Sequence, residues 1–289
     1  MLGRGNNPWP RWIDAQPGSK PEPRIAGLSV TWINHATVLI QIGGLNILTD
    51  PIWSLRASPF SFAGPRRVRP PGIRFEDLPA IDVVLLSHNH YDHCDIATLK
   101  KLEQTHHPHV LAGMNSKEFL HRKGMKNVTE LVHWDSIAIG KTKITFTPAQ
   151  HWSRRTLWDG NKMLWGGFII QNKNHTVYFA GDTGFGKFIH GIREQFPKID
   201  VALLPIGSYE PRWFMEFNHI NPEEAVLMHK ILGAKLSIGI HYKTFRLGDD
   251  GYDQPVVDLA QALKKHNVPA EQFLTLDLGE SVSYTGKTI

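Results

Sequence analysis

The stretch Val83-Val84-Leu85-Leu86-Ser87-His88-Asn89-His90-Tyr91-Asp92-His93 decides the fold of this chain. Its first residues are apolar, half of them are β-branched, and none is Gly or Pro, which predicts a short strand buried on both faces. The polar residues that follow would lie at the C-terminal end of this strand, where loops of α/β proteins carry their chemistry. Three histidines and one aspartate fall within six residues of this loop. Imidazole and carboxylate together suit Zn, Fe or Mn, so we interpret the loop as metal-binding rather than as a His-rich surface loop.

The spacing within the loop predicts two neighbouring metal sites. His88 and His90 are two residues apart in an extended segment, so both can turn to one side and bind one metal. Asp92 and His93 follow where the chain begins to bend, and they can face a second metal close by.

Later predicted strands also end in a potential ligand. These ligands are His151, Asp182 and His241, which follow the apolar segments 144–147, 176–180 and 236–240. A carboxylate has two oxygens and can bridge two metals, and Gly181 lets the backbone turn sharply beside Asp182. The predicted ligands are therefore His88, His90 and His151 for the first metal, Asp92, His93 and His241 for the second, and Asp182 between them.

This ligand set predicts hydrolytic chemistry. Two metals roughly 3.5–4 Å apart can hold a bridging hydroxide, polarise a substrate and stabilise the leaving oxygen. The pKa of the bound water falls towards about 7, so the nucleophile needs no separate strong base. Asp92 and Asp182 would thus be catalytic as well as ligating. The set fits hydrolysis of a phosphodiester or of an ester, and the ligands alone do not choose between them.

Two polar residues earlier in the chain, His35 and Asp50, are either satisfied structural groups or supports for the metal ligands. Asp50 ends a predicted strand, as the ligands do, so we place both residues behind the ligands. The remaining candidates are expected to be surface histidines, and they are His106, His107, His109, His121 and His133.

Length and composition bound the other possibilities. The chain has 289 residues, of which 41% are hydrophobic and 20% charged, as in one large globular domain. Its single cysteine, Cys94, excludes an intramolecular disulfide. No apolar run approaches the roughly 20 residues of a membrane span, and residues 1–23 lack the apolar region of a secretory signal. We therefore expect a cytoplasmic location, with membrane association open. The net charge of +5 fits anionic partners such as phospholipid or nucleic acid, but it fits many enzymes too.

The order of the predicted elements implies a single α/β domain. Strands and helices alternate in two runs with ligands at strand ends, which favours a four-layered αββα sandwich over residues 28–289. Residues 1–27 are expected to form an irregular N-terminal arm. A last helix is expected over 256–265 and a final strand over 273–278.

Two loops are expected beside the site. Residues 53–71 interleave aromatic and basic side chains, which could meet a membrane surface or simply pack on the domain. Residues 207–219 show no helical or strand period and are expected to form a loop over the site. Asn221, Pro222 and Glu224 then predict the start of a helix, as N-cap, first helical residue and N3.

The ligand set is that of the metallo-β-lactamase fold superfamily. Beyond the ligands, the chain resembles the N-acylphosphatidylethanolamine-hydrolysing phospholipases D in most segments after residue 28. The segments that carry the resemblance are TWINHATVLI (31–40), LTDPIWSLRASPFSFAGPRR (48–67), LPAIDVVLLSHNHYDHCD (78–95), FTPAQHWSRRTLWDGNKMLWG (146–166), FAGDTGF (179–185) and PIGSYEPRWFMEFNHINPEEAV (205–226).

The resemblance implies a phosphodiesterase with two Zn²⁺ ions, Fe or Mn being alternatives, that cuts N-acylphosphatidylethanolamine into N-acylethanolamine and phosphatidic acid. It also implies a peripheral membrane enzyme with phospholipid as substrate and a homodimeric assembly. The family points to a substrate-contacting pair that falls on Asn218 and His219, although relatives often carry Gln at the first position. With them we expect Trp152, Trp213 and Tyr91 to contact substrate.

Other functions remain alternatives. One is a different hydrolase of this fold that acts on a soluble phosphorylated substrate, such as a relative of the ascorbate-phosphate lactonases or of the tRNA 3′-processing nucleases. A nuclease needs more than the short basic tract at 66–69, so we expect no nucleic acid partner. A lactonase pocket needs fewer aromatic residues. The other alternative is a non-catalytic lipid-binding protein, which the complete ligand set disfavours because buried polar groups without a use are costly.

Overall fold

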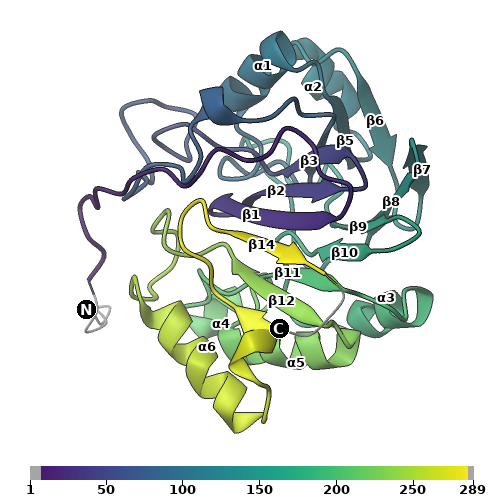
Figure 1. The fold of residues 1–289 in the computed structure, drawn as a ribbon. Coiled ribbons are helices and arrows are strands. Elements are labelled where there is room, and N and C mark those ends of the chain that lie inside the picture. The colour runs from purple at the N-terminus through teal and green to yellow at the C-terminus, as the bar shows by residue number, and fades with distance from the viewer. Residues whose placement is uncertain (1–7, 286–289) are drawn as a thin grey trace.

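The computed structural model describes residues 8–285 and consists of two stacked β-sheets with helices on both outer faces (Figure 1). The expected αββα sandwich is confirmed. Residues 1–7 of the expected arm and 286–289 of the expected domain lie outside the described residues, and residues 8–27 contain no helix or strand.

Each sheet has seven strands and mixes antiparallel with parallel pairs. The first sheet has the order β14 (Ser281–Tyr284), β1 (Leu28–Asn34), β2 (Thr37–Ile42), β3 (Leu45–Thr49), β4 (Val83–Leu86), β5 (His109–Gly113) and β6 (Val128–Leu131). The second has the order β13 (Phe273–Leu274), β12 (Leu236–Ile240), β11 (Val201–Pro205), β10 (Thr176–Phe179), β9 (Gly167–Gln171), β8 (Thr142–Thr147) and β7 (Ser136–Ile139).

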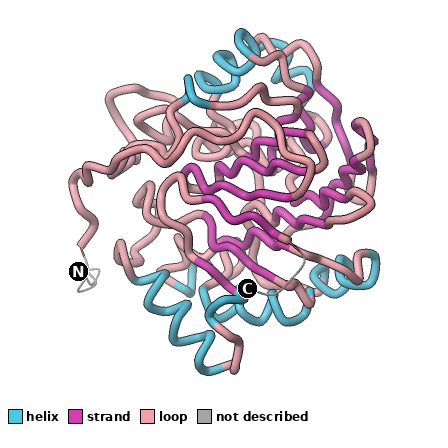
Figure 2. The backbone as a smooth tube through the Cα atoms, in the orientation of Figure 1, coloured by secondary structure: helices cyan, strands magenta, loops and turns pink. Residues whose placement is uncertain are grey.

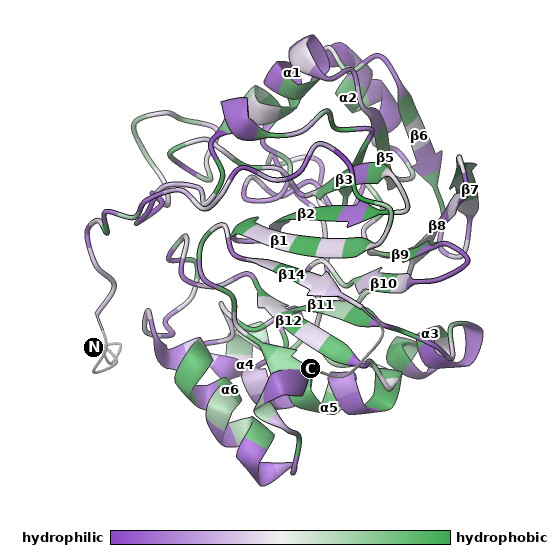
Figure 3. Cartoon of the chain, in the orientation of Figure 1, coloured by the Kyte–Doolittle hydropathy of each residue, from purple (hydrophilic) through white to green (hydrophobic). Residues whose placement is uncertain are grey.

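The helices form the two outer layers. The first sheet is covered by α1 (Ile96–Thr105) and α2 (Lys117–Arg122), and the second by α3 (Phe188–Gln195), α5 (Pro222–Leu232) and α6 (Gln254–Lys265) (Figure 1). In Figure 3 these helices mix hydrophilic and hydrophobic residues along their length, as expected of helices with one face on a sheet. Short 3₁₀ turns occur at Phe75–Asp77 and Ala270–Gln272.

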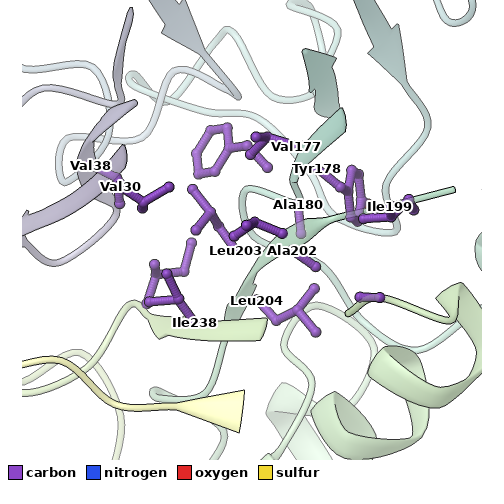
Figure 4. Packing of buried hydrophobic residues seen from close by; sticks show 14 of the residues in the cluster. Val30, Val38, Val177, Tyr178, Ala180, Ile199, Ala202, Leu203, Leu204 and Ile238 are labelled. Carbon is purple, nitrogen blue, oxygen red and sulfur yellow. The ribbon is translucent and has the colours of Figure 1, made fainter. Parts of the chain in front are cut away.

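The strand that opens the metal-binding stretch is buried on both faces, as predicted. Val83 and Leu85 belong to the core between the sheets, whereas Val84 and Leu86 belong to a second core under α1 and α2. Figure 4 shows part of the first core, in which side chains of both sheets meet. This double burial fixes the direction of the strand and therefore the position of the loop that follows it.

The predicted start of α5 is confirmed in detail. Asn221 caps the helix by accepting from the backbone N–H of Glu224, whose carboxylate accepts from the backbone N–H of Asn221 in return. Pro222 is the first helical residue, and Gly233 ends the helix in the left-handed conformation with φ = 59°. Asp95 caps α1 by accepting from the backbone N–H of Ala97.

Two local predictions were wrong. Residues 207–219 are not all loop, because Arg212–Met215 forms the short helix α4. The final strand ends at Leu274 instead of continuing to 278, since the chain turns at Asp277–Glu280 and crosses to the first sheet. There it forms β14, which pairs with β1.

The long connections lie mostly at one edge of the sheets (Figure 2). Residues 53–71 form a long loop without a helix or strand, as predicted. Within the described residues, no helix combines the length and the hydropathy needed to cross a membrane.

Candidate metal centre

The side chains predicted for the first metal site meet at the ends of β4 and β8. The Nε2 atom of His88 lies 2.8 Å from Nδ1 of His90, which lies 3.3 Å from Nε2 of His151. Three ring nitrogens thus converge on one side of the loop, and the arrangement is compatible with one metal ion.

The side chains predicted for the second site gather next to the first. The Oδ2 atom of Asp92 lies 3.1 Å from Nε2 of His93 and 3.3 Å from Nε2 of His241. Asp182, which follows β10, places its Oδ2 atom 3.1 Å from both of these nitrogens and 3.9 Å from Nε2 of His151. Asp182 therefore stands between the two groups of ligands.

The chemistry of this cluster fits bound metal ions. Among the described residues, Oδ1 of Asp182 is buried and has no hydrogen-bond partner, which is costly unless another group satisfies it. Burial and the neighbouring imidazoles hold the pKa of His88 and of His151 well below its usual range, so both rings are neutral, the form that binds a metal. Burial alone would lower the pKa of His93 too, but the carboxylates around that ring outweigh it and raise the pKa well above its usual value. A pocket that favours positive charge in this way suits a cation.

Asp50 contacts a predicted ligand directly. Its fully buried carboxylate lies 2.6 Å from Nδ1 of His93, and it accepts hydrogen bonds from the backbone N–H and the hydroxyl of Ser87. A carboxylate at Nδ1 holds the proton there, so Nε2 of His93 is free to face the centre.

His35 lies with the second group, because one of its ring nitrogens converges with ligand atoms of Asp92, His93 and His241. Its Nε2 atom is 2.8 Å from Oδ2 of Asp92, and its ring centroid is 4.0 Å from that of His241. Burial and the nearby His241 lower the pKa of His35 to about 3, so this ring is neutral. The Oδ2 atom of Asp92 therefore lies within 3.3 Å of a nitrogen of three rings, those of His35, His93 and His241.

Of the residues predicted to contact substrate, some lie beside the centre and others do not. His219 lies beside the centre, with Nδ1 3.9 Å from Oδ2 of Asp182, and the ring of Trp152 lies 4.6 Å from that of His90. Tyr91 donates its hydroxyl to the carbonyl of Arg155 and lies under that guanidinium, away from the predicted ligands. Trp213 is 77% exposed on α4.

Asn218 contacts the centre through its backbone. Its carbonyl accepts a hydrogen bond of 3.0 Å from Nδ1 of His151, which orients that ring. The five histidines expected on the surface belong to none of the groups of converging ligands among the described residues.

Comparison with known proteins identifies the fold family. The model of the beta-lactamase superfamily domain matches residues 45–242. The chain belongs to the metallo-β-lactamase superfamily. Its sequence is 40% identical over 269 residues to the N-acyl-phosphatidylethanolamine-hydrolyzing phospholipase D 1 of Caenorhabditis elegans, which covers 88% of this chain and 75% of that protein. It is 35% identical over 233 residues to the mitochondrial N-acyl-phosphatidylethanolamine-hydrolyzing phospholipase D of Saccharomyces cerevisiae, which covers 78% of this chain and 49% of that protein.

The solved structures agree on the fold. A metallo hydrolase from the hyperthermophilic archaeon Ignicoccus hospitalis superposes with a TM-score of 0.67 at 22% identity, over 90% of this chain and 99% of the other. The family match, these relatives and the converging His and Asp side chains identify the protein as a metal-dependent hydrolase of the metallo-β-lactamase fold.

This metallo-β-lactamase domain carries one feature that the sequence prediction only touched on. Of thirteen exposed large apolar side chains in the described residues, nine lie in the three segments 55–62, 152–158 and 213–217, the second of which directly follows the predicted ligand His151. We call these nine the apolar rim, and they are Leu55, Phe60, Phe62, Trp152, Leu157, Trp158, Trp213, Phe214 and Phe217. The aromatic residues were visible in the sequence, but their exposure was not.

Three polar residues also escaped the sequence prediction. Ser87 holds Asp50, and Gln150 and Arg212 donate to backbone carbonyls of the segment that carries His219. Ser87 and Gln150 stand directly before the predicted ligands His88 and His151 in the sequence, whereas Arg212 stands beside none.

Proposed function

We propose that this metal-dependent hydrolase is a phosphodiesterase that cuts N-acylphosphatidylethanolamine into N-acylethanolamine and phosphatidic acid. The products require that water adds to phosphorus and that the bond between phosphorus and the ethanolamine oxygen breaks. The similarity to two phospholipases D of this specificity supports the substrate class.

The observation that carries the proposal is the apolar rim. Trp152 directly follows the predicted ligand His151, and Phe217 lies two residues before His219. A cavity of about 440 Å³ is lined by Leu55 and Phe60 of the rim together with Tyr91 and Arg155. Exposed apolar side chains in the segments that carry His151 and His219 suit a substrate with a phosphate head and long acyl chains.

The proposal extends to the partner and the cofactor. We expect the rim to rest on a phospholipid surface, in a peripheral association to which the net charge of +5 adds attraction for anionic lipids. We expect Zn²⁺ at both predicted positions, and a homodimer as the assembly.

The predicted roles of the residues follow from their placement. When bound, two metal ions would polarise the phosphate and lower the pKa of water at the centre. The seven predicted ligands would hold these ions, and Asp50 and His35 would keep His93 and Asp92 in place. His219 stands beside Asp182, with Nδ1 3.9 Å from Oδ2, and we expect its ring to donate an N–H to a phosphate or leaving oxygen. Trp152 would form the wall beside His90.

The test is hydrolysis of N-acylphosphatidylethanolamine in mixed micelles by zinc-loaded protein. Release of N-acylethanolamine and phosphatidic acid is expected, and both products should disappear in His88→Ala and Asp182→Asn. A matched control is His190→Ala, which removes an exposed histidine of α3 and should keep full activity.

The proposal fails if the lipid remains intact while a soluble phosphodiester such as bis-p-nitrophenyl phosphate is cut. That result would support a hydrolytic centre but exclude N-acylphosphatidylethanolamine as its substrate.

A further inference from the structure

Three consecutive carbonyls fix the backbone that carries His219. The carbonyl of Phe217 accepts from the side-chain amide of Gln150 at 2.9 Å, and that of Asn218 accepts from Nδ1 of His151 at 3.0 Å. The carbonyl of His219 itself accepts from Nη1 of Arg212 at 2.9 Å. Two of the three donors thus come from the segment of a predicted metal ligand, and the third comes from α4.

Arg212 is held rigidly for this task. Its Nη2 atom donates to both carboxylate oxygens of Glu224, at 3.0 and 2.9 Å. The same carboxylate accepts from the backbone N–H of Asn221, so it also caps α5. Both side chains are only 25% exposed, and the bonds from one nitrogen to both carboxylate oxygens restrict the position of the guanidinium. Arg212 therefore joins α4, the start of α5 and the carbonyl of His219.

The ring of His219 depends on this backbone. Within the described residues its Nδ1 atom is buried without a hydrogen-bond partner, and the ring lies between those of His151 and His241, at 5.1 and 5.5 Å between centroids. With no side-chain hydrogen bond to orient it, the ring takes its place over Asp182 from the backbone that the three donors hold.

We propose that Arg212 is a positioning residue for hydrolysis, acting through the carbonyl of His219 to keep its ring beside the reacting phosphate. The proposal rests on the proposed function for the role of His219. The proposal predicts that replacing Arg212 lowers kcat only when the His219 ring is present.

A double-mutant cycle tests this dependence. Arg212→Gln is expected to lower kcat roughly tenfold or more with little change in KM, because small displacements of a substrate-contacting group cost this much. In a His219→Ala background the same substitution should change kcat less than about twofold, since the group it positions is absent. A merely structural role of Arg212 would lower kcat by the same factor in both backgrounds.

The matched control is Arg193→Gln. Arg193, on α3, donates to the carbonyl of Leu232 at 3.0 Å, so it makes the same kind of contact away from the centre. The kcat of Arg193→Gln should equal that of the unmodified protein. If Arg212→Gln fails to fold, Glu224→Gln releases the guanidinium from its other side and should show the same dependence on His219.

A second measurement does not rely on turnover. The imidazole NMR signal of His219, assigned by its loss in His219→Ala, should shift or broaden in Arg212→Gln and stay unchanged in Arg193→Gln. An unchanged His219 signal, or equal losses of kcat in both backgrounds, would overturn the proposal.

The cycle is run on N-acylphosphatidylethanolamine and on bis-p-nitrophenyl phosphate. Failure to cut the lipid refutes the proposed function alone, because the cycle on the soluble diester and the NMR signal still decide the role of Arg212.

Discussion

Replacing Asp50 by asparagine should weaken metal binding without removing any predicted ligand. The Asp50 carboxylate is fully buried and lies 2.6 Å from Nδ1 of His93, while its other contacts are the backbone N–H and hydroxyl of Ser87. An asparagine would still accept from Ser87 through its oxygen, which turns its NH₂ group towards His93. The ring would then carry its proton on Nε2, the atom that faces the centre, and that proton must leave before a metal can bind.

The size of the effect follows from the contact that is lost. Carboxylates behind a ligating histidine typically contribute 10–100-fold to metal affinity, which corresponds to about 1.4–2.8 kcal/mol. Complete burial of Asp50 leaves no water to take over its role, so we expect a loss towards the upper end of this range. Competition of the protein with a chromophoric zinc chelator would measure it.

The control for this prediction is Ser87→Ala. It removes the hydroxyl that donates to Asp50 and lies 2.9 Å from Nδ1 of His88, but it leaves the Asp50 carboxylate at Nδ1 of His93, so its affinity loss should be clearly smaller. A zinc affinity of Asp50→Asn within twofold of the unmodified protein would refute the reasoning, since the proton on His93 would then not depend on Asp50.

Three further predictions concern metal removal, the rim and the core. Chelation of the metal should lower the melting temperature, and added Zn²⁺ should restore it, because a ligand at 1,000 times its Kd stabilises by about 4 kcal/mol; an unchanged melting temperature would argue against a bound metal. The double variant Phe62→Ser and Trp158→Ser should bind phospholipid vesicles about tenfold or more weakly, since a fully buried aromatic side chain contributes roughly 1.5–3 kcal/mol. Hydrolysis of a soluble phosphodiester should fall much less, and equal losses would contradict a role in lipid contact. Phe146→Ala should destabilise the protein by about 3–5 kcal/mol in urea titrations, because Phe146 is fully buried and packs on Phe168 at 5.0 Å between ring centroids; a loss below about 1 kcal/mol would mean that the core refills the space.

The fold and the predicted ligands could be anticipated because their signals are local. The apolar run before His88 is recognisable as a strand without knowledge of its partners, and the strands before Asp182 and His241 are of the same kind. Because parallel strands end at one edge of a sheet, ligands at strand ends were expected to meet, and the structure brings them together. The start of α5 was also predictable, because its N-cap, first helical residue and N3 residue are close neighbours in the sequence.

The features that escaped prediction depend on distant contacts. Helix α4 has four residues, too few to show a helical period, and its Arg212 contacts residues seven and twelve positions further along the chain. Strand β14 pairs with β1 across most of the chain, as in the contact of Ser281 with Thr31, 250 residues apart. No local pattern encodes such a pairing.

The core and the metal centre are coupled through strained backbone. His35, Asp50 and His241 all have positive φ, at 46°, 33° and 62°, a conformation that side chains other than glycine adopt at a cost of about 1–3 kcal/mol each. Each stands where a buried strand ends, and the backbone N–H of His241, after the second sheet, donates to the carbonyl of His35, in the first, at 2.9 Å. The centre therefore joins the two sheets at the same place where it collects its ligands. Packing between the sheets offsets this strain. A core substitution that weakens the packing should therefore let His35, Asp50 and His241 relax from positive φ, and it should lower the affinity for metal even where it touches no ligand.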